Sequence, residues 1–416
     1  MTEKIRQYIE NFSLDNQYIN TPEHQKLKTV VEIKKFDGLE FPLFINEFWT
    51  SRQRQSSSLH EISYRACFKA QLPRFFINLM SSENDIVYDP FSGRGTTVIE
   101  AALLGRRIIA NDINPLSEIL SFPRIHIPEL NDIKIRLSEL ELNNSSRADI
   151  DLSMFYHPHT EAEIVSMREY LNVRRSNGKE DNIDRWIRMV ATNRLTGHSC
   201  GFFSVYTLPP NQAISQKKQK IINQRRNQIP EYRDIKSLIQ KKSRSLLRNL
   251  AKHEIKNLNM IKDDSLFLSV DARETKEIAK NSVQLTVTSP PFLDVVQYSD
   301  DNWLRCWFNG FDHQDISKKI TMEKTIHGWT NVMDSVFDEL YRITKHGGWV
   351  AFEVGEVRKG KINLEDYIVP IGLKSGFDCL GVLINKQNFT KTSNIWGVKN
   401  NIRGTNTNRI ALFRKV

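Results

Sequence analysis

The chain has 416 residues, of which 39% are hydrophobic and 26% are charged, so it can bury a full core and form more than one structural unit. No stretch approaches the roughly 20 consecutive apolar residues of a membrane helix, and the first residues show neither the basic nor the apolar part of a secretion signal. The four cysteines lie far apart without CxxC spacing, which argues against both a zinc site and a disulfide framework. We therefore expect a cytoplasmic protein without a metal centre.

Positive charge is concentrated in one segment of the chain. Lys and Arg number 59 against 49 Asp and Glu, and residues 211–256 hold 13 basic and three acidic side chains, so the remainder is nearly neutral. A concentration of this kind favours a polyanionic partner, although a basic run is often only a solvated helix face.

The predicted elements follow a regular order only after a polar beginning. Residues 1–58 are mixed in character, with one modest apolar stretch at 39–48, and we expect them to form a peripheral extension. From residue 85 the chain reads as strand, helix and strand: DIVYDPFSG, TVIEAALLG and RRIIAND. Further apolar runs, typical of strands buried in a mainly parallel sheet, occur at 266–272, 283–289, 348–355, 379–386 and 409–415.

The alternation of strands and helices is lost between the second and third predicted strands. Residues 121–262 contain helical spacing and most of the positive charge, and no repeat stands out. We interpret this segment as an inserted, mainly helical domain. The predicted boundaries are 1–58 for the extension, 59–120 and 263–416 for the two parts of one domain, and 121–262 for the insert.

Two short motifs follow predicted strands. The string DPFSGRGTT, residues 89–97, ends the first strand and opens a helix; Gly93 and Gly95 permit a sharp turn and the close approach of a ligand. Asp112 ends the next strand, where a carboxylate can accept hydrogen bonds from both hydroxyls of a ribose. The second motif, SPPF at 289–292, follows the strand at 283–289. Either motif alone is compatible with an ordinary turn.

Together the two motifs resemble the cofactor and catalytic motifs of the amino-directed DNA methyltransferases, which use S-adenosyl-L-methionine. The resemblance implies an α/β fold with a Rossmann-like seven-stranded methyltransferase sheet and an inserted target-recognition domain. It also implies cofactor contacts from the loop, with Asp112 on the ribose, Asp271 near the adenine and, on a looser match, Lys69 near the methionine carboxylate. The loop residues concerned are Asp89, Pro90, Phe91, Ser92, Gly93, Gly95, Thr96 and Thr97. Asp271 could equally be a simple strand-end cap.

The residue types of SPPF suit methylation of an exocyclic amine. The lone pair of such an amine is delocalised into the ring, so the site must hold its hydrogens with acceptors while the nitrogen attacks. Ser289 Oγ and the carbonyl of Pro290 can be those acceptors, Pro291 helps to fix the loop, and Phe292 can stack on a flipped-out base. No Pro-Cys dipeptide occurs in the chain, so the covalent route of cytosine-C5 methylation has no candidate nucleophile.

The identity of the methylated base stays open between two amines. In the family, Ser at the first motif position is associated mainly with cytosine N4, whereas Asp or Asn is associated mainly with adenine N6, so we favour cytosine N4. Here the cofactor loop precedes the catalytic loop by 191 residues, an order that cytosine-N4 enzymes show less often, which weakens that preference. RNA amino-methyltransferases share both motifs, and a silent DNA-binding subunit would keep the fold without the reaction.

The resemblance also implies double-stranded DNA as the partner and a bacterial or archaeal cell as the location. The insert would then neutralise DNA phosphates, and a role in restriction-modification beside a cognate endonuclease is a reasonable hypothesis. The sequence leaves the oligomeric state open. The candidate DNA-contacting residues are Lys217, Lys218, Lys220, Arg225, Arg226, Lys241, Lys242 and Arg244.

Overall fold

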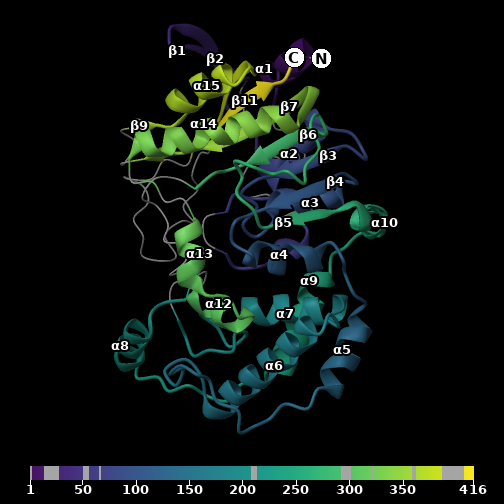
Figure 1. Cartoon of the computed structure of the whole chain (residues 1–416), viewed down its shortest axis with the longest axis vertical. Coiled ribbons are helices and arrows are strands. Elements are labelled where there is room, and N and C mark those ends of the chain that lie inside the picture. Colours follow the sequence, from purple (N-terminus) through teal and green to yellow (C-terminus); the bar gives the residue numbers. More distant parts are fainter. Residues whose placement is uncertain are drawn as a thin grey trace, which may run out of the picture.

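The computed structural model of the chain describes most of its length (Figure 1). The described residues are 2–13, 28–49, 56–64, 67–207, 213–291, 301–320, 323, 325–357, 362–386 and 407–416. Among these residues, no helix combines the length and the apolar character that a membrane span requires.

A nine-stranded sheet occupies the upper part of the molecule in Figure 1 and has the order β1-β2-β10-β11-β7-β6-β3-β4-β5. Strands β5, β4, β3, β6 and β7 run parallel, and β11 is antiparallel to both of its neighbours. Seven neighbouring strands of this sheet, β10, β11, β7, β6, β3, β4 and β5, are those that the apolar runs predict. The expected methyltransferase-type sheet is therefore confirmed. The strands span β1 Val30–Phe36, β2 Leu39–Asn46, β3 Ile86–Asp89, β4 Arg107–Asn111, β5 Leu266–Leu268, β6 Val283–Thr288, β7 Thr344–Val354, β10 Asp378–Lys386 and β11 Thr407–Arg414, with a small separate pair of β8 Glu356–Val357 and β9 Ile362–Asn363.

The N-terminal segment departs from the expected peripheral extension. Strands β1 and β2 form a hairpin, and β2 pairs in parallel with β10, so this segment continues the central sheet. The physical reason is that β10 would otherwise present an unpaired edge, and β2 covers it while burying Phe44 completely. Helix α1, Thr2–Glu10, adds Ile5 and Ile9 to the core. The two chain ends meet where Arg414 donates to the Thr2 hydroxyl, as Figure 1 also shows.

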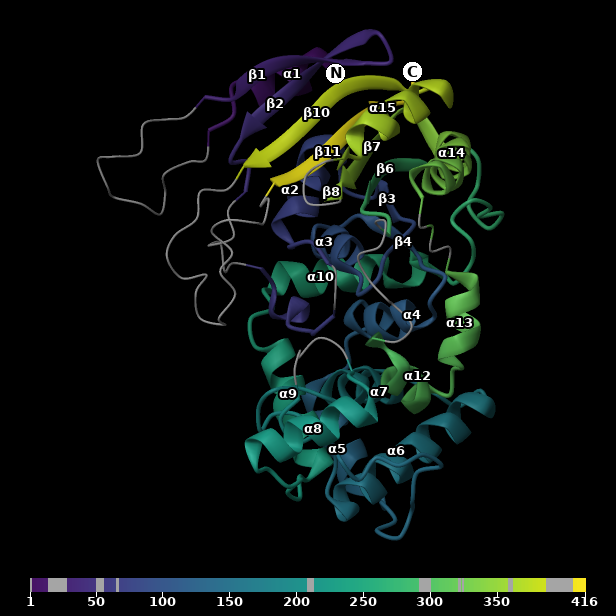
Figure 2. The same ribbon diagram turned by 90° about the vertical axis from the view of Figure 1, so that its left-hand side faces the viewer.

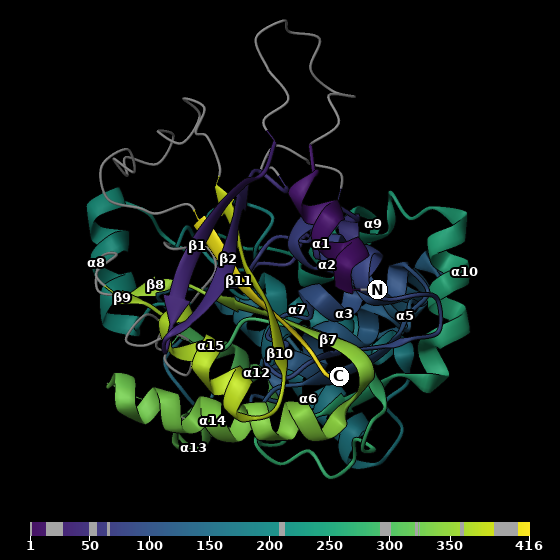
Figure 3. The ribbon, with the colours of Figure 1, turned by 90° about the horizontal axis from the view of Figure 1, so that it is seen from above.

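Helices cover both faces of the sheet, as the view from above in Figure 3 shows. Helices α2 (Gln71–Met80), α3 (Thr96–Leu103) and α10 (Lys252–Ile261) belong to one side, and α14 (Ile326–Ile343) and α15 (Glu365–Lys374) to the other. Along β7, Trp349 and Ala351 pack in the hydrophobic cluster that contains α2 and α3, while Val350 and Phe352 pack in the cluster that contains α14 and α15. This alternation is the period of two expected for a strand buried on both faces.

The insert forms the lower part of the molecule in Figures 1 and 2 and is helical. Trp186, Phe155 and Ile239 from the insert belong to the same hydrophobic cluster as the apolar residues of α3, so one continuous core joins the insert to the sheet. The helices before and within it are α4 Leu116–Ser121, α5 Leu130–Glu139, α6 Pro158–Ser176, α7 Asn182–Arg194, α8 Gln216–Arg226 and α9 Ile235–Leu247, whereas α10, which also falls within residues 121–262, packs on α3 beside the sheet. Helices α12 (Trp303–Asn309) and α13 (His313–Lys319) follow the second motif, and α12 packs on α6 and α7 of the insert.

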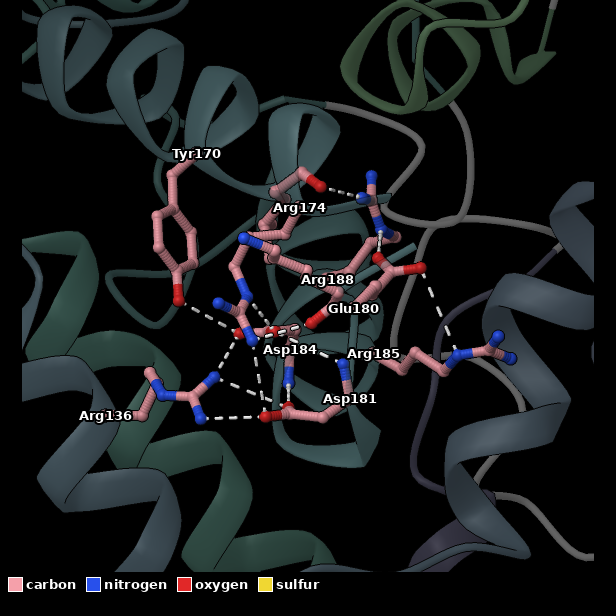
Figure 4. A network of polar contacts seen from close by, with 10 residues as sticks. Arg136, Tyr170, Arg174, Glu180, Asp181, Asp184, Arg185 and Arg188 are labelled. Carbon is pink, nitrogen blue, oxygen red and sulfur yellow. Dashed lines mark hydrogen bonds and ion pairs between the residues drawn. The ribbon is translucent and has the colours of Figure 1, made fainter. Parts of the chain in front are cut away.

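A buried carboxylate holds the insert helices together (Figure 4). Asp184 of α7 is fully buried and accepts hydrogen bonds from Arg136 of α5, Arg174 of α6 and the Tyr170 hydroxyl. Asp181 caps the same helix by accepting from the Asp184 amide over 2.9 Å. Part of the positive charge of the insert is therefore neutralised internally.

Candidate cofactor and catalytic site

One cavity lies at the carboxyl ends of the parallel strands, where the loops after β3, β4, β5 and β6 meet. The space between its walls, including the part open to solvent, is about 980 Å³. Ligands of open parallel sheets bind at this end of the strands because the loops from neighbouring strands converge there. Seven of the candidate site residues line the cavity: Pro90, Phe91, Gly93, Asp112, Asp271, Ser289 and Pro291.

The turn between β3 and α3 requires its two glycines. Gly93 and Gly95 have φ angles of +52° and +77°, in the left-handed region that favours glycine. A Cβ on Gly95 would lie 2.6 Å from the Cβ of Ser121, so this position also lacks space for a side chain. The Gly93 amide donates to Asp112 Oδ2 over 2.8 Å, and the Asn114 amide donates to the other oxygen over 2.9 Å. These bonds fix the Asp112 carboxylate at the cavity wall.

The environment of Asp112 disfavours its charge. Burial raises its pKa to about 6, and the hydrogen bonds from the Asn114 and Gly93 amides only partly oppose this effect. Asp112 is nevertheless partly exposed and lines the cavity. An acceptor in this position can bind a pair of hydroxyl groups, as the sequence predicts for a ribose.

Other residues of the DPFSGRGTT loop do not line the cavity and instead build its frame. Asp89 is buried, and its Oδ1 accepts from the Thr288 hydroxyl over 2.6 Å and from the Phe91 amide over 3.1 Å. The Thr97 hydroxyl donates to the carbonyl of Val287 over 3.0 Å. Two hydrogen bonds therefore tie the first motif directly to the end of β6, just before the second motif. Burial raises the pKa of Asp89 to about 6, while the Thr288 hydroxyl and the Phe91 amide act in the opposite direction.

The remaining loop residues have structural contacts as well. The Ser92 hydroxyl donates to the Asp89 carbonyl over 2.8 Å, and the Thr96 hydroxyl accepts from Arg94 over 3.2 Å. Arg94, at the centre of the motif, donates to the carbonyls of His60 and Ile62 and so holds the segment before α2 against the cofactor loop. Sequence reasoning missed this role of Arg94, because its acceptors are backbone atoms of a segment without a recognisable motif.

The second motif places Ser289 and Pro291 at the cavity, whereas Phe292 lies outside the described residues and Pro290 does not line the wall. Trp329 of α14 also lines the cavity, and its Nε1 donates to the carbonyl of Pro291 over 3.0 Å. This bond anchors Pro291 of the second motif to α14, which covers the face of the sheet opposite to α3. The amphipathic pattern of α14 predicts a buried Trp329, but nothing in the sequence indicates its partner.

Three further residues complete the account of the predicted cofactor contacts. Asp271 lines the cavity and forms an ion pair with Arg273, which also lines it. Lys69 is exposed and does not line the cavity. Tyr64, which sequence reasoning did not select, lines the wall beside Gly93.

The predicted DNA-contacting residues divide into exposed and engaged groups. On α8, Lys217, Lys218 and Arg225 are exposed, Lys220 pairs with Asp151 over 3.1 Å, and the Arg226 guanidinium lies 3.8 Å from the centre of the Tyr206 ring. On α9, Lys241 and Arg244 are exposed, whereas Lys242 is half-buried beside Glu61. Burial lowers the pKa of Lys242 to about 8, which makes it a poorer phosphate contact than its neighbours.

A second hollow connects the start of α8 with α12. It is lined by Lys218, Arg168, Trp303 and Trp307, among others. Trp303 donates to the carbonyl of Ile214 over 3.3 Å, and Trp307 donates to Asp149 over 2.7 Å. Both indoles are thus held against the insert.

Comparisons with known proteins show similarity to DNA methylases. The DNA methylase family model for N6 and N4 methyltransferases matches residues 4–118, which include the N-terminal hairpin and the cofactor loop. The chain is 25% identical to the type II methyltransferase M.BsoBI of Geobacillus stearothermophilus over 331 residues, which cover 71% of this chain and 61% of that protein. It is 24% identical to the type II methyltransferase M.MvaI of Kocuria varians over 295 residues, covering 65% and 60% respectively.

The chain spans about three fifths of the length of these curated relatives. A solved structure of a candidate DNA modification methylase from Thermus thermophilus, complexed with S-adenosyl-L-methionine, is 25% identical and covers 35% of this chain and 53% of its own. Its TM-score of 0.22 is too low to support an argument about the fold, which rests on the strand order instead. The chain is thus similar to DNA methylases in its first 118 residues and to type II methyltransferases over most of its length, and the two motifs that resemble those of amino-directed DNA methyltransferases meet in one cavity.

Proposed function

We propose that this protein is a DNA methyltransferase that transfers the methyl group of S-adenosyl-L-methionine to the exocyclic N4 amine of a flipped-out cytosine. The observation that carries the proposal is the shared cavity, in which Gly93 and Asp112 of the cofactor side face Ser289 and Pro291 of the catalytic side. The hydrogen bond from Thr288 to Asp89 fixes the distance between the two sides. A frame that joins the two motifs in this way supports the proposal, because methyl transfer needs both sides held at a fixed distance.

The residues of the cavity fit the cofactor. Gly93 brings the backbone to the wall without a side chain, and a ligand there meets the Asp112 carboxylate at the next strand end. Phe91 and Val270 supply apolar surface for a purine ring, and Asp271 supplies an acceptor for its amino group. When bound, the cofactor supplies an electrophilic methyl group on a sulfonium.

The catalytic loop then has to hold and orient the amine. Ser289 Oγ, at the cavity wall, accepts one of its hydrogens, which helps to turn the nitrogen lone pair out of the ring plane and toward the cavity. Trp329 keeps the loop in place through its bond to the Pro291 carbonyl. Loop and amine are thus aligned before the reaction, which lowers the entropic part of the barrier.

Duplex DNA would reach the site along the insert. Exposed Lys217, Lys218 and Arg225 on α8, with Lys241 and Arg244 on α9, form a basic surface suited to phosphates. Replacing Lys217 and Lys218 by Gln is expected to lower the slope of log K against log salt concentration by about 2, because about one counterion is released per phosphate contact. Lys4→Gln on α1, at the opposite end of the molecule in Figure 1, is the matched control.

The decisive experiment incubates the protein with tritiated cofactor and unmethylated plasmid DNA, followed by nucleoside digestion and mass spectrometry. N4-methylcytosine, lost in Ser289→Ala, is the expected result. N6-methyladenine would keep the mechanism and reassign the base. Cofactor binding without any label in DNA would contradict the proposal and direct the search to RNA substrates or to a silent DNA-binding subunit.

A separate cofactor-binding measurement tests Asp112. Asp112→Asn should weaken binding, and binding to the unaltered protein should weaken as the pH falls through about 6, where the carboxylate becomes protonated. A role in restriction-modification would be supported by a neighbouring endonuclease whose cleavage is blocked by the methylated DNA.

A further inference from the structure

The N-terminal hairpin leaves one edge of the central sheet without a strand beside it. Strand β1 is the last strand in the order, and within the described part of the chain no strand pairs with its outer side (Figure 3). Val30, Val31 and Ile33 of this strand and Leu39 of β2 are exposed although they are apolar, and the exposed fraction of Ile33 is 63%. An exposed apolar edge strand of this kind pairs readily with a strand of another molecule.

The turn of the hairpin determines which backbone groups face outward. Phe36 and Leu39 are partners on either side of the two-residue turn, so they exchange both of their hydrogen bonds, and hydrogen-bonded residues then alternate along β1. The amide and carbonyl groups of the residues in between point away from β2. These residues are Val31, Ile33 and Lys35.

Two lysines of β1 are held by carboxylates of their own chain. Lysine side chains often protect an exposed strand edge from pairing. Here Lys34 forms ion pairs with Glu365 and Asp366 of α15, and Lys35 pairs with Glu40 of β2 over 3.4 Å. Both ammonium groups thus contact neighbours within the molecule, and the outer edge of β1 keeps its capacity to pair.

The sequence of β1 matches an antiparallel copy of itself in one register. A two-fold axis at Ile33 sets Ile33 against its own copy, Val31 against Lys35, and the exposed Glu32 against Lys34. Charges of opposite sign then face each other twice, and the outward backbone groups of both strands are all used. An axis at Lys35 would instead set two lysines against each other, and an axis at Val31 would leave Lys35 beyond the end of the partner strand.

We propose that the occupant of this edge is a second copy of the chain, bound through β1 in the antiparallel register centred on Ile33. The two nine-stranded sheets then become one continuous sheet across the two-fold axis. Glu32 and Lys34 make the contact self-complementary, as a two-fold interface requires. One strand from each copy is a small interface, so the dimer forms reversibly with concentration.

Cysteine cross-linking tests the register. Residues that face each other in a hydrogen-bonded pair have Cα atoms about 5.5 Å apart, within the span of a disulfide. Ile33→Cys should therefore form disulfide-linked dimers under mild oxidation. Lys35→Cys is the matched control and should not, because this register puts it about 14 Å from its own copy. Both changes are made together with Cys67→Ser and Cys200→Ser, since these native thiols are exposed.

Sedimentation velocity of the full chain measures the association itself. The unaltered protein should shift from a species of 48.5 kDa toward one of twice that mass as its concentration rises. Ile33→Pro removes an outward N–H but no hydrogen bond to β2, so it should abolish the dimer and leave the circular dichroism spectrum unchanged. Glu32→Lys should weaken association about tenfold, because it creates two contacts between like charges; Glu83→Lys, at an exposed site before β3, should not.

Three results would overturn the proposal. The first is a protein that stays monomeric at every concentration, and the second is a dimer that survives Ile33→Pro. The third is cross-linking that is absent at Ile33→Cys or equal at Lys35→Cys, and this readout holds even if Ile33→Pro fails to fold. Methyl transfer is measured separately, so none of these results decides the proposed function.

Discussion

The bond between Thr288 and Asp89 is the most direct link between the two motifs, and Thr288→Val removes it alone. Both residues are almost completely buried, and the donor and acceptor atoms lie 2.6 Å apart. Val has nearly the same shape as Thr, so the change deletes a donor to a buried carboxylate without opening a cavity. A hydrogen bond to a charged group contributes about 1.5–3 kcal/mol, so we expect the free energy of unfolding at pH 8 to fall by about 2 kcal/mol.

The size of this loss should depend on pH. Burial raises the pKa of Asp89 in the folded protein to about 6, above the unfolded value near 3.9, so its ionisation reduces stability as the pH rises through this range. The Thr288 hydroxyl favours the ionised form, so Thr288→Val should raise the pKa of Asp89 further. Below about pH 6 the carboxyl is protonated in both proteins and the bond joins neutral groups, so the loss at pH 5 should be only about 1 kcal/mol.

The same strand offers a matched control. Thr286 lies two residues earlier on the same face of β6, is fully buried, and its hydroxyl has no hydrogen-bond partner among the described residues. Thr286→Val should therefore be neutral or stabilising, because it removes an unpaired polar atom. Urea unfolding followed by circular dichroism at both pH values measures the differences. Equal losses in the two variants, or a loss in Thr288→Val that does not change with pH, would refute the reasoning.

Two further predictions concern the frame of the cavity. Gly95→Ala should lower the free energy of unfolding by about 3 kcal/mol, since it combines left-handed strain with a Cβ 2.6 Å from Ser121; Gly178→Ala, at φ +65° with no atom near its Cβ, should lose only about 1 kcal/mol in the same urea titration. Trp329→Phe removes the donor to the Pro291 carbonyl and should lower kcat about 10-fold in the methylation assay with little change in stability; an unaltered kcat would show that the loop holds its position without this bond.

The sequence was sufficient for the central strands and for the two motifs. Strands such as β10 contain near-continuous apolar runs, and each motif directly follows a predicted strand. Parallel strands bring their carboxyl ends to one edge, so the meeting of Gly93 and Ser289 could be expected from these two facts. The contacts that position the motifs join residues far apart in the chain and have no local pattern. Trp329 with Pro291, and Thr288 with Asp89, are of this kind.

The N-terminal hairpin shows a signal that was present and overlooked. Asp37 and Gly38 both have positive φ and connect β1 to β2, and an Asp-Gly pair between two strands is the strongest short-range indication of a hairpin. Pro42 and the exposed residues of β1 obscured it, because an edge strand need not show a buried face. The exposed position of Lys69 has a different cause. Its motif match lies in a segment that does not adjoin a predicted strand, so the match does not fix where the side chain lies.

Under the proposed function, the continuous core that α3 shares with the insert limits how this protein could change its target sequence. Side chains of α3, which begins in the cofactor loop, pack in one cluster with Trp186 and Ile239 of the insert. An insert grafted from a relative would bring only its own half of that packing, leaving mismatched volumes against the helix that shapes the cofactor turn. New specificity would therefore arise more readily from exchanges at the exposed positions of α8 and α9 than from wholesale replacement of the insert.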